Sequence, residues 1–217
     1  MKKFWRNNAL SITFLFLFVF SMIGQVCSGH NLHNRQRTED GQPALSFSEY
    51  LMSGHFVQAT FENWESEFLQ MMLFVLLTIK LKQKGSSESK KFEEEEVDRE
   101  PDPSRAGAPW PVRKGGIVLA FYKHSLTIAF ALLFLVSFCL HFQGSLKDEN
   151  EELIRKGFSP NSVMEYVGSS RFWFESFQNW QSEFLSVLAI VVLSIYLRQI
   201  GSPQSKPVDA SNDETGE

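Results

Sequence analysis

Two glutamates, Glu67 and Glu183, are the side chains best placed to do chemistry in this chain of 217 residues. Each belongs to one copy of the same nine-residue motif, and an apolar run follows each copy. A carboxylate inside lipid is costly, and it is usually kept to bind an ion or to move a proton. In the first turns of a helix it is ordinary, because it meets unpaired N–H groups and the positive end of the helix dipole. Glu67 follows Trp64 by three residues, close to the expected membrane interface, so the structural interpretation is favoured.

The polar neighbours of these glutamates recur with them. Their amide and hydroxyl groups could cap the starts of two helices, or they could hydrogen-bond across a symmetric interface. Capping is the more economical account. The tryptophans would suit the membrane interface, where amphipathic rings prefer to lie. The neighbours are Asn63, Trp64 and Ser66 in the first copy and Asn179, Trp180 and Ser182 in the second.

Other residue types offer no pattern for catalysis or metal binding. His124 and His141 have no second His, Cys or Asp at the spacing of a metal site. Cys27 and Cys139 are the only two cysteines and stand far apart, so buried free thiols are favoured over a disulfide. An enzyme would need a nucleophile, a base or a metal constellation. We therefore expect no enzyme, no cofactor and no metal.

The glutamate motif is part of a duplication that covers much of the chain. Phe61–Leu69 matches Phe177–Leu185, and the residue numbers differ by 116. Gly85–Lys90 matches Gly201–Lys206 at the same offset. These later pieces lack the strand and the Gly-x-x-x-x-Gly-Lys frame of a phosphate-binding loop. We expect them to end a helix and to anchor it through lysine stems that reach the lipid headgroups.

The complete pattern is Phe-x-Asn-Trp-x-Ser-Glu-Phe-Leu, then an apolar run, then Leu-(Lys/Arg)-Gln-x-Gly-Ser-x-x-Ser-Lys. It resembles a family of uncharacterised bacterial membrane proteins that is classed as a domain of unknown function. The resemblance covers most of the chain except the acidic linker and the tail. The two copies differ where Ser87 replaces Pro203 and Lys91 replaces Pro207. The resemblance implies a bacterial inner membrane and brings no activity, substrate or assigned residues.

Apolar residues are massed in four runs with polar segments between them, a pattern typical of a polytopic membrane protein. A hydrocarbon core of about 30 Å needs about 20 mostly apolar residues as a helix. Four such segments can be placed. We expect spans at about 5–26, 64–82, 117–142 and 180–198.

The first apolar segment also has the features of a secretory signal peptide. Basic residues precede it, and Gly24–Gly29 could be a cleavage zone. However, Leu10–Ile12 matches Leu126–Ile128 in the second half, where a signal peptide cannot stand. We therefore expect the first segment to be retained as a span.

The sequence thus predicts an all-α membrane protein in which four transmembrane helices form two helical hairpins, related as parallel repeats. Ser46–Glu49 and Ser162–Glu165 carry the capping-box pattern. They predict short amphipathic extracytoplasmic helices that either lie on the bilayer interface or pack on the helix ends. Charge, Pro and Gly predict disorder between the repeats and in the tail. The expected parts are 1–91 (first repeat), 92–113 (disordered acidic cytoplasmic linker), 114–207 (second repeat) and 208–217 (disordered tail).

Four spans place both termini on one side of the membrane, and the positive charges choose that side. Of the 21 Lys and Arg residues, 15 fall on the side of the termini and six on the opposite side. The termini and the linker are therefore expected in the cytoplasm. The net charge of −4 and the lack of a basic stripe argue against nucleic acid as a partner.

Two functions remain. The first is a structural or interaction component of the bacterial inner membrane, in contact with the lipid bilayer and with a second copy or another membrane protein. Paired symmetric motifs and the lack of charge near mid-bilayer favour it. The alternative is a small transporter or channel in which Glu67 and Glu183 face an outer vestibule. The sequence names neither a substrate nor a partner.

Overall fold

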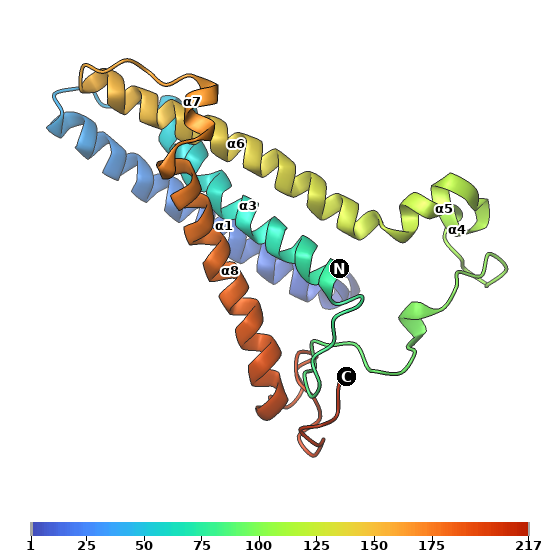
Figure 1. The fold of residues 1–217 in the computed structure, drawn as a ribbon. Coiled ribbons are helices and arrows are strands. Elements are labelled where there is room, and N and C mark those ends of the chain that lie inside the picture. The colour runs from blue at the N-terminus through green and yellow to red at the C-terminus, as the bar shows by residue number, and fades with distance from the viewer. Residues whose placement is uncertain (1, 217) are drawn as a thin grey trace. The chain divides into compact units, whose positions relative to one another are not determined.

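A computed structural model of the chain describes residues 2–216, with side chains from residue 3 onward (Figure 1). Within these residues the regular secondary structure is helical and there is no strand, which confirms the predicted all-α class. The elements are α1 (Lys2–Glu39), α2 (Phe47–Leu51), α3 (Gly54–Leu77), the 3-10 helix η1 (Glu96–Asp98), α4 (Trp110–Lys114), α5 (Gly116–Lys123), α6 (Ser125–Arg155), α7 (Val163–Val167) and α8 (Ser170–Tyr196).

Among the described residues, 3 helices are long and apolar enough to cross a membrane, namely α1, α6 and α8. Helix α3, with 24 residues, has the length but carries Glu62, Glu65 and Glu67 before its apolar part. Three carboxylates raise the cost of placing a helix in lipid. The α-helix also ends at Leu77, before the expected end of the span at Lys82. The prediction of four spans is therefore not confirmed.

Helices α3 and α8 begin earlier than the sequence analysis predicts. A serine precedes each helix. Ser53 Oγ accepts a hydrogen bond from the amide of Phe56 at 3.2 Å, and Ser169 Oγ accepts one from the amide of Arg171 at 3.2 Å. These hydroxyls satisfy amides that the helix leaves unpaired at its start. The motif asparagines and serines consequently lie inside the helices, and the prediction that they cap the helix starts is wrong.

The chain divides into two compact units. Unit 1 consists of Met1–Phe61 and Leu140–Phe172, and unit 2 consists of Glu62–Cys139 and Trp173–Glu217. Each unit therefore contains segments from both halves of the sequence.

Unit 1 has a small aromatic core that holds α2 and α7. Tyr50, Tyr166 and Phe172 are buried. Both short helices carry the predicted capping box: the amides of Ser46 and Ser162 each donate to a glutamate carboxylate at 2.8 Å, and both serine hydroxyls accept in return. The local sequence therefore sets where α2 and α7 begin, as expected.

Two asparagines in unit 1 hold the loops that follow the long helices. Leu45 donates its amide to Asn34 Oδ1 at 2.7 Å, and Asn34 Nδ2 donates to the carbonyl of Leu45 at 2.9 Å. The amide of Asn161 and the side chain of Asn150 make the same pair of bonds at 2.7 and 3.0 Å. The positions are 116 residues apart, so the duplicated sequence makes the same bonds twice.

The start of α3 and the middle of α6 approach each other backbone to backbone in unit 1. A Cβ atom added to Gly54 would lie 2.5 Å from the amide nitrogen of Asp148, and one added to Gly144 would lie 2.4 Å from that of Gln58. Any larger residue would have to push the two helices apart. These glycines set how closely the helices pack.

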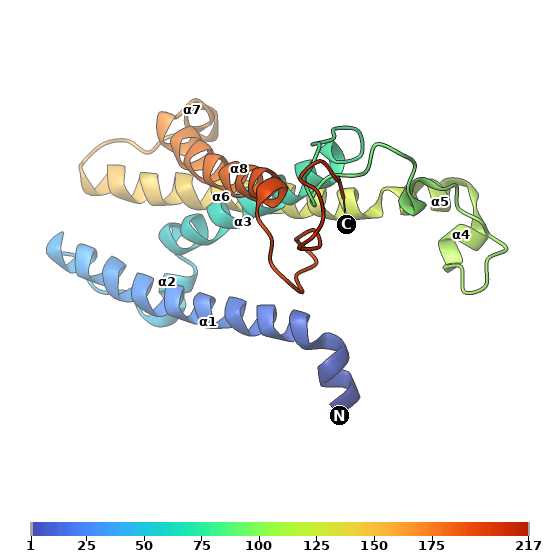
Figure 2. The same cartoon turned by 90° about the horizontal axis from the view of Figure 1, so that it is seen from below.

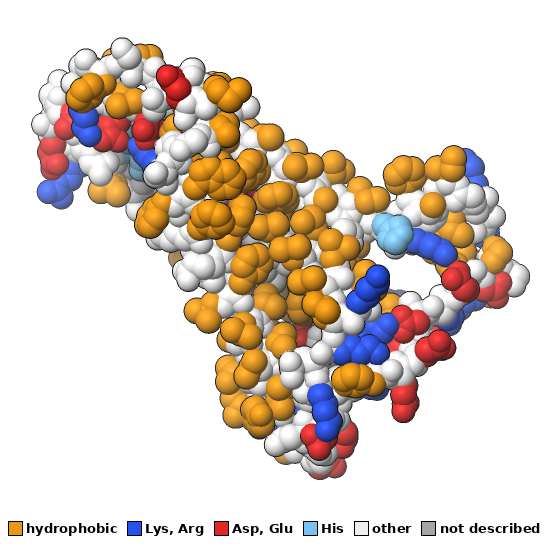
Figure 3. Space-filling view, viewed as in Figure 1, with side chains coloured by type: hydrophobic (Ala, Val, Ile, Leu, Met, Phe, Trp, Pro, Cys, Tyr) orange, Lys and Arg blue, Asp and Glu red, His pale blue; other side chains and the backbone are white. Residues whose placement is uncertain are grey.

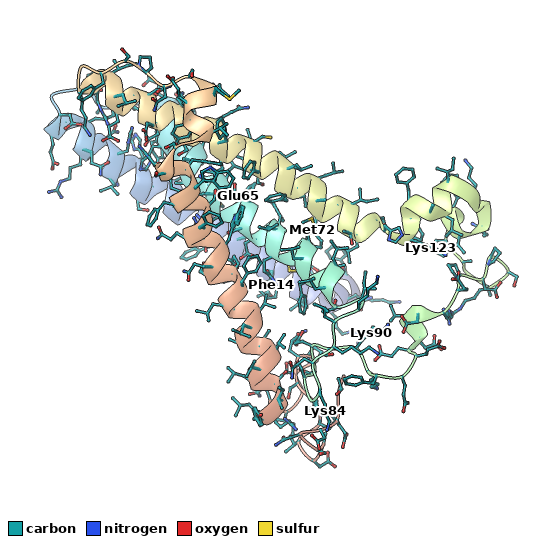
Figure 4. All side chains as sticks on the ribbon, viewed as in Figure 1. Phe14, Glu65, Met72, Lys84, Lys90 and Lys123 are labelled. Atoms are coloured by element: carbon teal, nitrogen blue, oxygen red, sulfur yellow. The ribbon has the colours of Figure 1, made fainter. Side chains whose placement is uncertain are left out.

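In unit 2, a serine closes the loop after α3 and an equivalent serine closes the loop after α8. Ser89 Oγ accepts a hydrogen bond from the amide of Gln83 at 2.9 Å, and Ser205 Oγ accepts one from the amide of Gln199 at 2.8 Å. The Gly-Ser-x-x-Ser-Lys pieces are thus built turns that follow the helices, as predicted. Figure 4 shows Lys84 and Lys90 in the first of these loops.

The C-terminal residues of unit 2 enclose a lysine. Lys206 is buried, and its Nζ donates to the carbonyls of Ser211, Asn212 and Glu214 at 2.9–3.2 Å. The amide of Gly216 donates to the carbonyl of Ser86 at 2.9 Å. The segment for which composition predicts disorder thus contacts the two Gly-Ser loops in this structure.

Both halves have a break near the start of the first long helix. Asn8 in α1 has φ −125° and ψ 15°, and His124 between α5 and α6 has φ −117° and ψ 11°. Figure 2 shows the resulting bend close to the N-terminal end of α1. The two positions are again 116 residues apart.

Large apolar side chains stay exposed along the long helices. Figure 3 shows them gathered over α6 and α8, with charged side chains toward the ends of the helices. A soluble protein rarely exposes apolar surface of this extent, whereas lipid solvates it. On α1 the exposed set includes Phe14, Phe16, Phe18 and Phe20, on α6 Leu132, Leu133, Leu135 and Val136, and on α8 Leu185, Leu188 and Leu193.

Candidate functional site

The two glutamates singled out in the sequence both lie in unit 2, well inside their helices. Glu67 on α3 is exposed, and Glu183 on α8 is half-buried. Their negative charges repel each other, so the structure brings the repeated carboxylates within electrostatic range. Because α3 begins at Gly54 and α8 at Ser170, neither carboxylate meets the free amides of a helix start. The dipole explanation for these residues is therefore wrong.

The repeated serines bond to their own helices. Ser66 Oγ donates to the carbonyl of Asn63 at 2.8 Å, and Ser182 Oγ donates to the carbonyl of Asn179 at 2.8 Å. Asn179 Nδ2 donates to the carbonyl of Glu175 at 3.0 Å. Such bonds satisfy polar groups within one helix and hold no ligand. Three of the predicted site residues thus bond to the backbone of their own helix.

Glu65 is a candidate site residue that the sequence analysis did not identify. It is fully buried in unit 2, and its Oε1 accepts a hydrogen bond from the indole N–H of Trp180 at 2.9 Å. Figure 4 shows Glu65 between α3 and α8. Trp180 was expected to serve as an interfacial ring, and in the structure it joins the two helices. The sequence does contain one signal, since Glu65 is an acid where the second copy of the motif has Gln181.

Glu65 belongs to a buried polar stripe on α3. Ser66 and Gln70 are also buried, and their spacing of four residues places them on one face of the helix. Polar side chains on the inward face of a membrane helix serve as hydrogen-bonding contacts between helices or as stations for a proton or a cation. The stripe can therefore join helices or hold a small cation.

A second feature of unit 2 is an open cavity of about 710 Å³ beside the loop after α3. Val75, Ile79 and Leu126 give it an apolar floor. Two of its basic side chains form ion pairs, because Lys90 contacts Asp98 and the ammonium group of Lys123 lies 3.1 Å from a carboxylate oxygen of Glu100. These pairs weaken the attraction of the cavity for an anion.

The fold is that of a helical protein with helices long and apolar enough to cross a membrane, which is consistent with a membrane protein, and it contains a buried polar stripe. The chain belongs to the family described as Domain of unknown function (DUF6766), whose model matches residues 1–217. Comparison with curated proteins and with solved structures gives no match. The expected membership of a family of unknown function is confirmed, while the bacterial origin stays a prediction.

Proposed function

We propose that this chain is a non-enzymatic structural or interaction component of the bacterial inner membrane. The observation that carries the proposal is where the duplicated polar side chains make their bonds. Asn34 and Asn150 hold loop backbones, and Ser89 and Ser205 close turns, each pair with the same geometry. A duplication that keeps backbone bonds of this kind preserves a scaffold.

The proposed arrangement has four spans in two parallel hairpins, with the termini and the linker in the cytoplasm. The positive charges support the orientation, with 15 of 21 on the side of the termini. The matched breaks at Asn8 and His124 support the parallel repeat. Helix α3 becomes the fourth span if its carboxylates turn toward other helices, and the bond from Trp180 to Glu65 provides one such contact.

Labelling of single cysteines in intact cells tests this topology. Cys27 and Cys139, which are free as expected but exposed rather than buried, are first replaced by serine. Ser48 or Ser104, both exposed, is then changed to cysteine. A membrane-impermeant maleimide should label Ser48→Cys in intact cells and Ser104→Cys only after permeabilisation. Because the two positions flank α3, equal labelling would mean that α3 does not cross. Labelling of Ser104→Cys in the linker of intact cells, without labelling of Ser48→Cys, would show the orientation opposite to the one proposed.

The interaction role is tested by photo-crosslinking from exposed apolar positions. A photoreactive amino acid replaces Phe47 on α2, which is 50% exposed, or Met164 on α7, which is 83% exposed. We expect a discrete adduct that contains a second copy or one other membrane protein. A photoreactive residue at Glu94 in the linker is the control. Adducts to lipid alone, from both apolar positions, would contradict an interaction role.

A transporter or channel is the second candidate, and one observation favours it. Glu67 and Glu183 interact electrostatically in unit 2, where Glu65 is also buried. Proton and cation flux in proteoliposomes should then fall when Glu67→Gln is combined with Glu183→Gln. Glu93→Gln with Glu94→Gln in the linker is the matched control for lost charge. Flux through the unsubstituted protein that equals that of empty liposomes would contradict this alternative. Flux that neither double variant changes would contradict it as well.

A further inference from the structure

Two histidines in the first half of the chain stand where the second half has an ion pair. His33 and His55 precede Glu149 and Arg171 by 116 residues. In unit 1, Arg171 Nη1 lies 3.2 Å from Glu149 Oε2 and also contacts Asp148 and Glu152. The corresponding imidazoles of His33 and His55 pack against each other, with ring centroids 4.7 Å apart and planes inclined by 31°. The first half thus replaces a permanent charge pair with two titratable rings.

His33 is buried and His55 is half-buried, and the pair is incompletely bonded. His33 is 5% exposed, and its buried Nε2 has no hydrogen-bond partner among the described residues. His55 Nδ1 lies 3.4 Å from the hydroxyl of Tyr50, a residue of the unit 1 core. The pair joins the end of α1 to the start of α3, and Tyr50 joins it to α2. This packing favours a neutral His33, since two adjacent imidazolium ions would repel each other.

The charged groups around the pair favour this neutral state. Arg37 on α1 and Arg155 on α6 disfavour a positive charge on His33, and so does His55. Asp148 on α6 acts in the opposite direction, but its carboxylate is held by Arg171 at 2.6 Å. Burial, the largest effect, and these neighbours lower the pKa of His33 from 6.5 to about 4. His33 lies seven residues beyond the apolar segment 5–26, outside the hydrocarbon core.

We propose that His33 and His55 form a pH-sensitive latch, which holds the end of α1 against α2 and the start of α3 at neutral pH and releases it in acid. Protonation would place two cations in contact beside two arginines, so unit 1 would loosen in the first half of the chain. In the second half, Arg171 stands in place of a titratable ring and contacts the carboxylates of Asp148, Glu149 and Glu152. The second half of unit 1 would therefore stay closed.

Hydrogen exchange of the full chain in phospholipid nanodiscs tests the latch, and the second half of the chain serves as an internal control. After correction for the intrinsic effect of pH, amides of residues 27–61 should exchange on the order of tens of times faster at about pH 4.5 than at about pH 7.5. Amides of residues 143–177 should change little. Equal responses of the two segments, or no response, would overturn the proposal.

Replacement of the histidine pair by the ion pair of the second half gives the sharper test. His33→Glu with His55→Arg places in the first half the residues that the second half already uses. The acid response of residues 27–61 should disappear in this variant. If the variant does not fold, His55→Gln alone should reduce the response, because it removes one of the two charges. His124→Gln, at an exposed position in unit 2, should leave the response unchanged.

Zinc provides a third readout. Because we propose that the two histidines bind protons and not a metal ion, Zn²⁺ added at about pH 7.5 should not change the hydrogen exchange of residues 27–61. Protection that appears only with Zn²⁺ and is lost in His33→Glu with His55→Arg would identify a metal site. That outcome would overturn the latch. A full acid response retained by the ion-pair variant would do the same.

Discussion

At the scale of single residues, the chain meets the cost of polar groups in apolar surroundings by giving them partners. Glu65 is buried on α3, and the indole N–H of Trp180 on α8 bonds to its carboxylate. Glu67, two residues further, is exposed on the same helix. Two glutamates of the same motif therefore have different surroundings, because their side chains point in different directions around the helix.

Loss of the indole donor should destabilise the contact between α3 and α8. Trp180→Phe keeps most of the aromatic volume but removes the hydrogen bond to a charged acceptor, which contributes about 1.5–3 kcal/mol. We expect a lower free energy of unfolding in detergent by about that amount. Trp110→Phe, at a position 58% exposed, is the matched control. Equal effects of the two substitutions would show that the bond to Glu65 does not stabilise the protein.

The stability of unit 1 should depend on pH through His33. The folded pKa of about 4 lies below the ordinary 6.5, so the unfolded chain binds the proton more tightly. The full stability is present above pH 6.5 and falls by about 3 kcal/mol at most as the pH approaches 4. Denaturant unfolding at several pH values measures this. His33→Gln should flatten the profile in that range, and an unchanged profile would rule out His33 as the cause.

At the scale of the elements, backbone contacts decide how the helices of unit 1 pack. A Cβ atom added to Gly54 or to Gly144 would lie 2.5 Å or less from an amide nitrogen of the neighbouring helix. The Tyr50 side chain likewise leaves no room for a larger residue at position 29, since a Cβ atom added to Gly29 would lie 2.2 Å from the Tyr50 hydroxyl oxygen. In the second half the residue equivalent to Gly29 is Ser145, whose hydroxyl lies 2.5 Å from that of Tyr166. In the first half a glycine thus leaves room for the tyrosine hydroxyl, whereas in the second half a serine forms a hydrogen bond with it.

Gly144→Ala should weaken this packing. The added methyl group would meet the backbone of α3, and backbone cannot move aside as a flexible side chain can. Overpacking of this kind costs about 1–3 kcal/mol. Gly24→Ala on α1 is the control, because no described atom lies within 4 Å of its added Cβ. Thermal unfolding should separate the two, and a variant Gly144→Ala as stable as Gly24→Ala would contradict the close approach.

At the scale of the whole molecule, segments far apart in the chain complete each other. In unit 2 the hydroxyl groups of Ser86 and Ser194 lie 2.9 Å apart, and the amide of Gly85 donates to Thr215 Oγ1 at 2.9 Å. The loop after α3 is therefore fixed by the end of α8 and by the C-terminal segment. Units 1 and 2 each draw on both halves of the sequence in this way.

Removal of residues 208–217 should open this region. The deletion takes away the carbonyls that surround the ammonium group of Lys206 and the acceptor for the amide of Gly85. We expect faster cleavage by trypsin after Lys84, because its loop would lose bonds. Sites in the linker, such as Arg105, serve as the internal control. Unchanged cleavage after Lys84, relative to the linker sites, would show that the tail does not hold this loop.

The sequence by itself determined the helical class, the family resemblance, the capping boxes of α2 and α7 and the turns that follow α3 and α8. These features depend on hydropathy and on hydrogen bonds between residues a few positions apart, which a pattern of residues records directly. It misplaced the starts of α3 and α8, because hydropathy reports burial in lipid and the helices continue through their polar first turns after Ser53 and Ser169.

Only the tertiary structure decided which polar groups meet. It buried Glu65 against Trp180 and left Glu67 exposed, and it brought His33 to His55 and Gly54 to α6. The physical reason is that these contacts join segments up to 115 residues apart. They depend on which faces of the helices turn toward each other, and a change of one residue along a helix turns a side chain by about 100°.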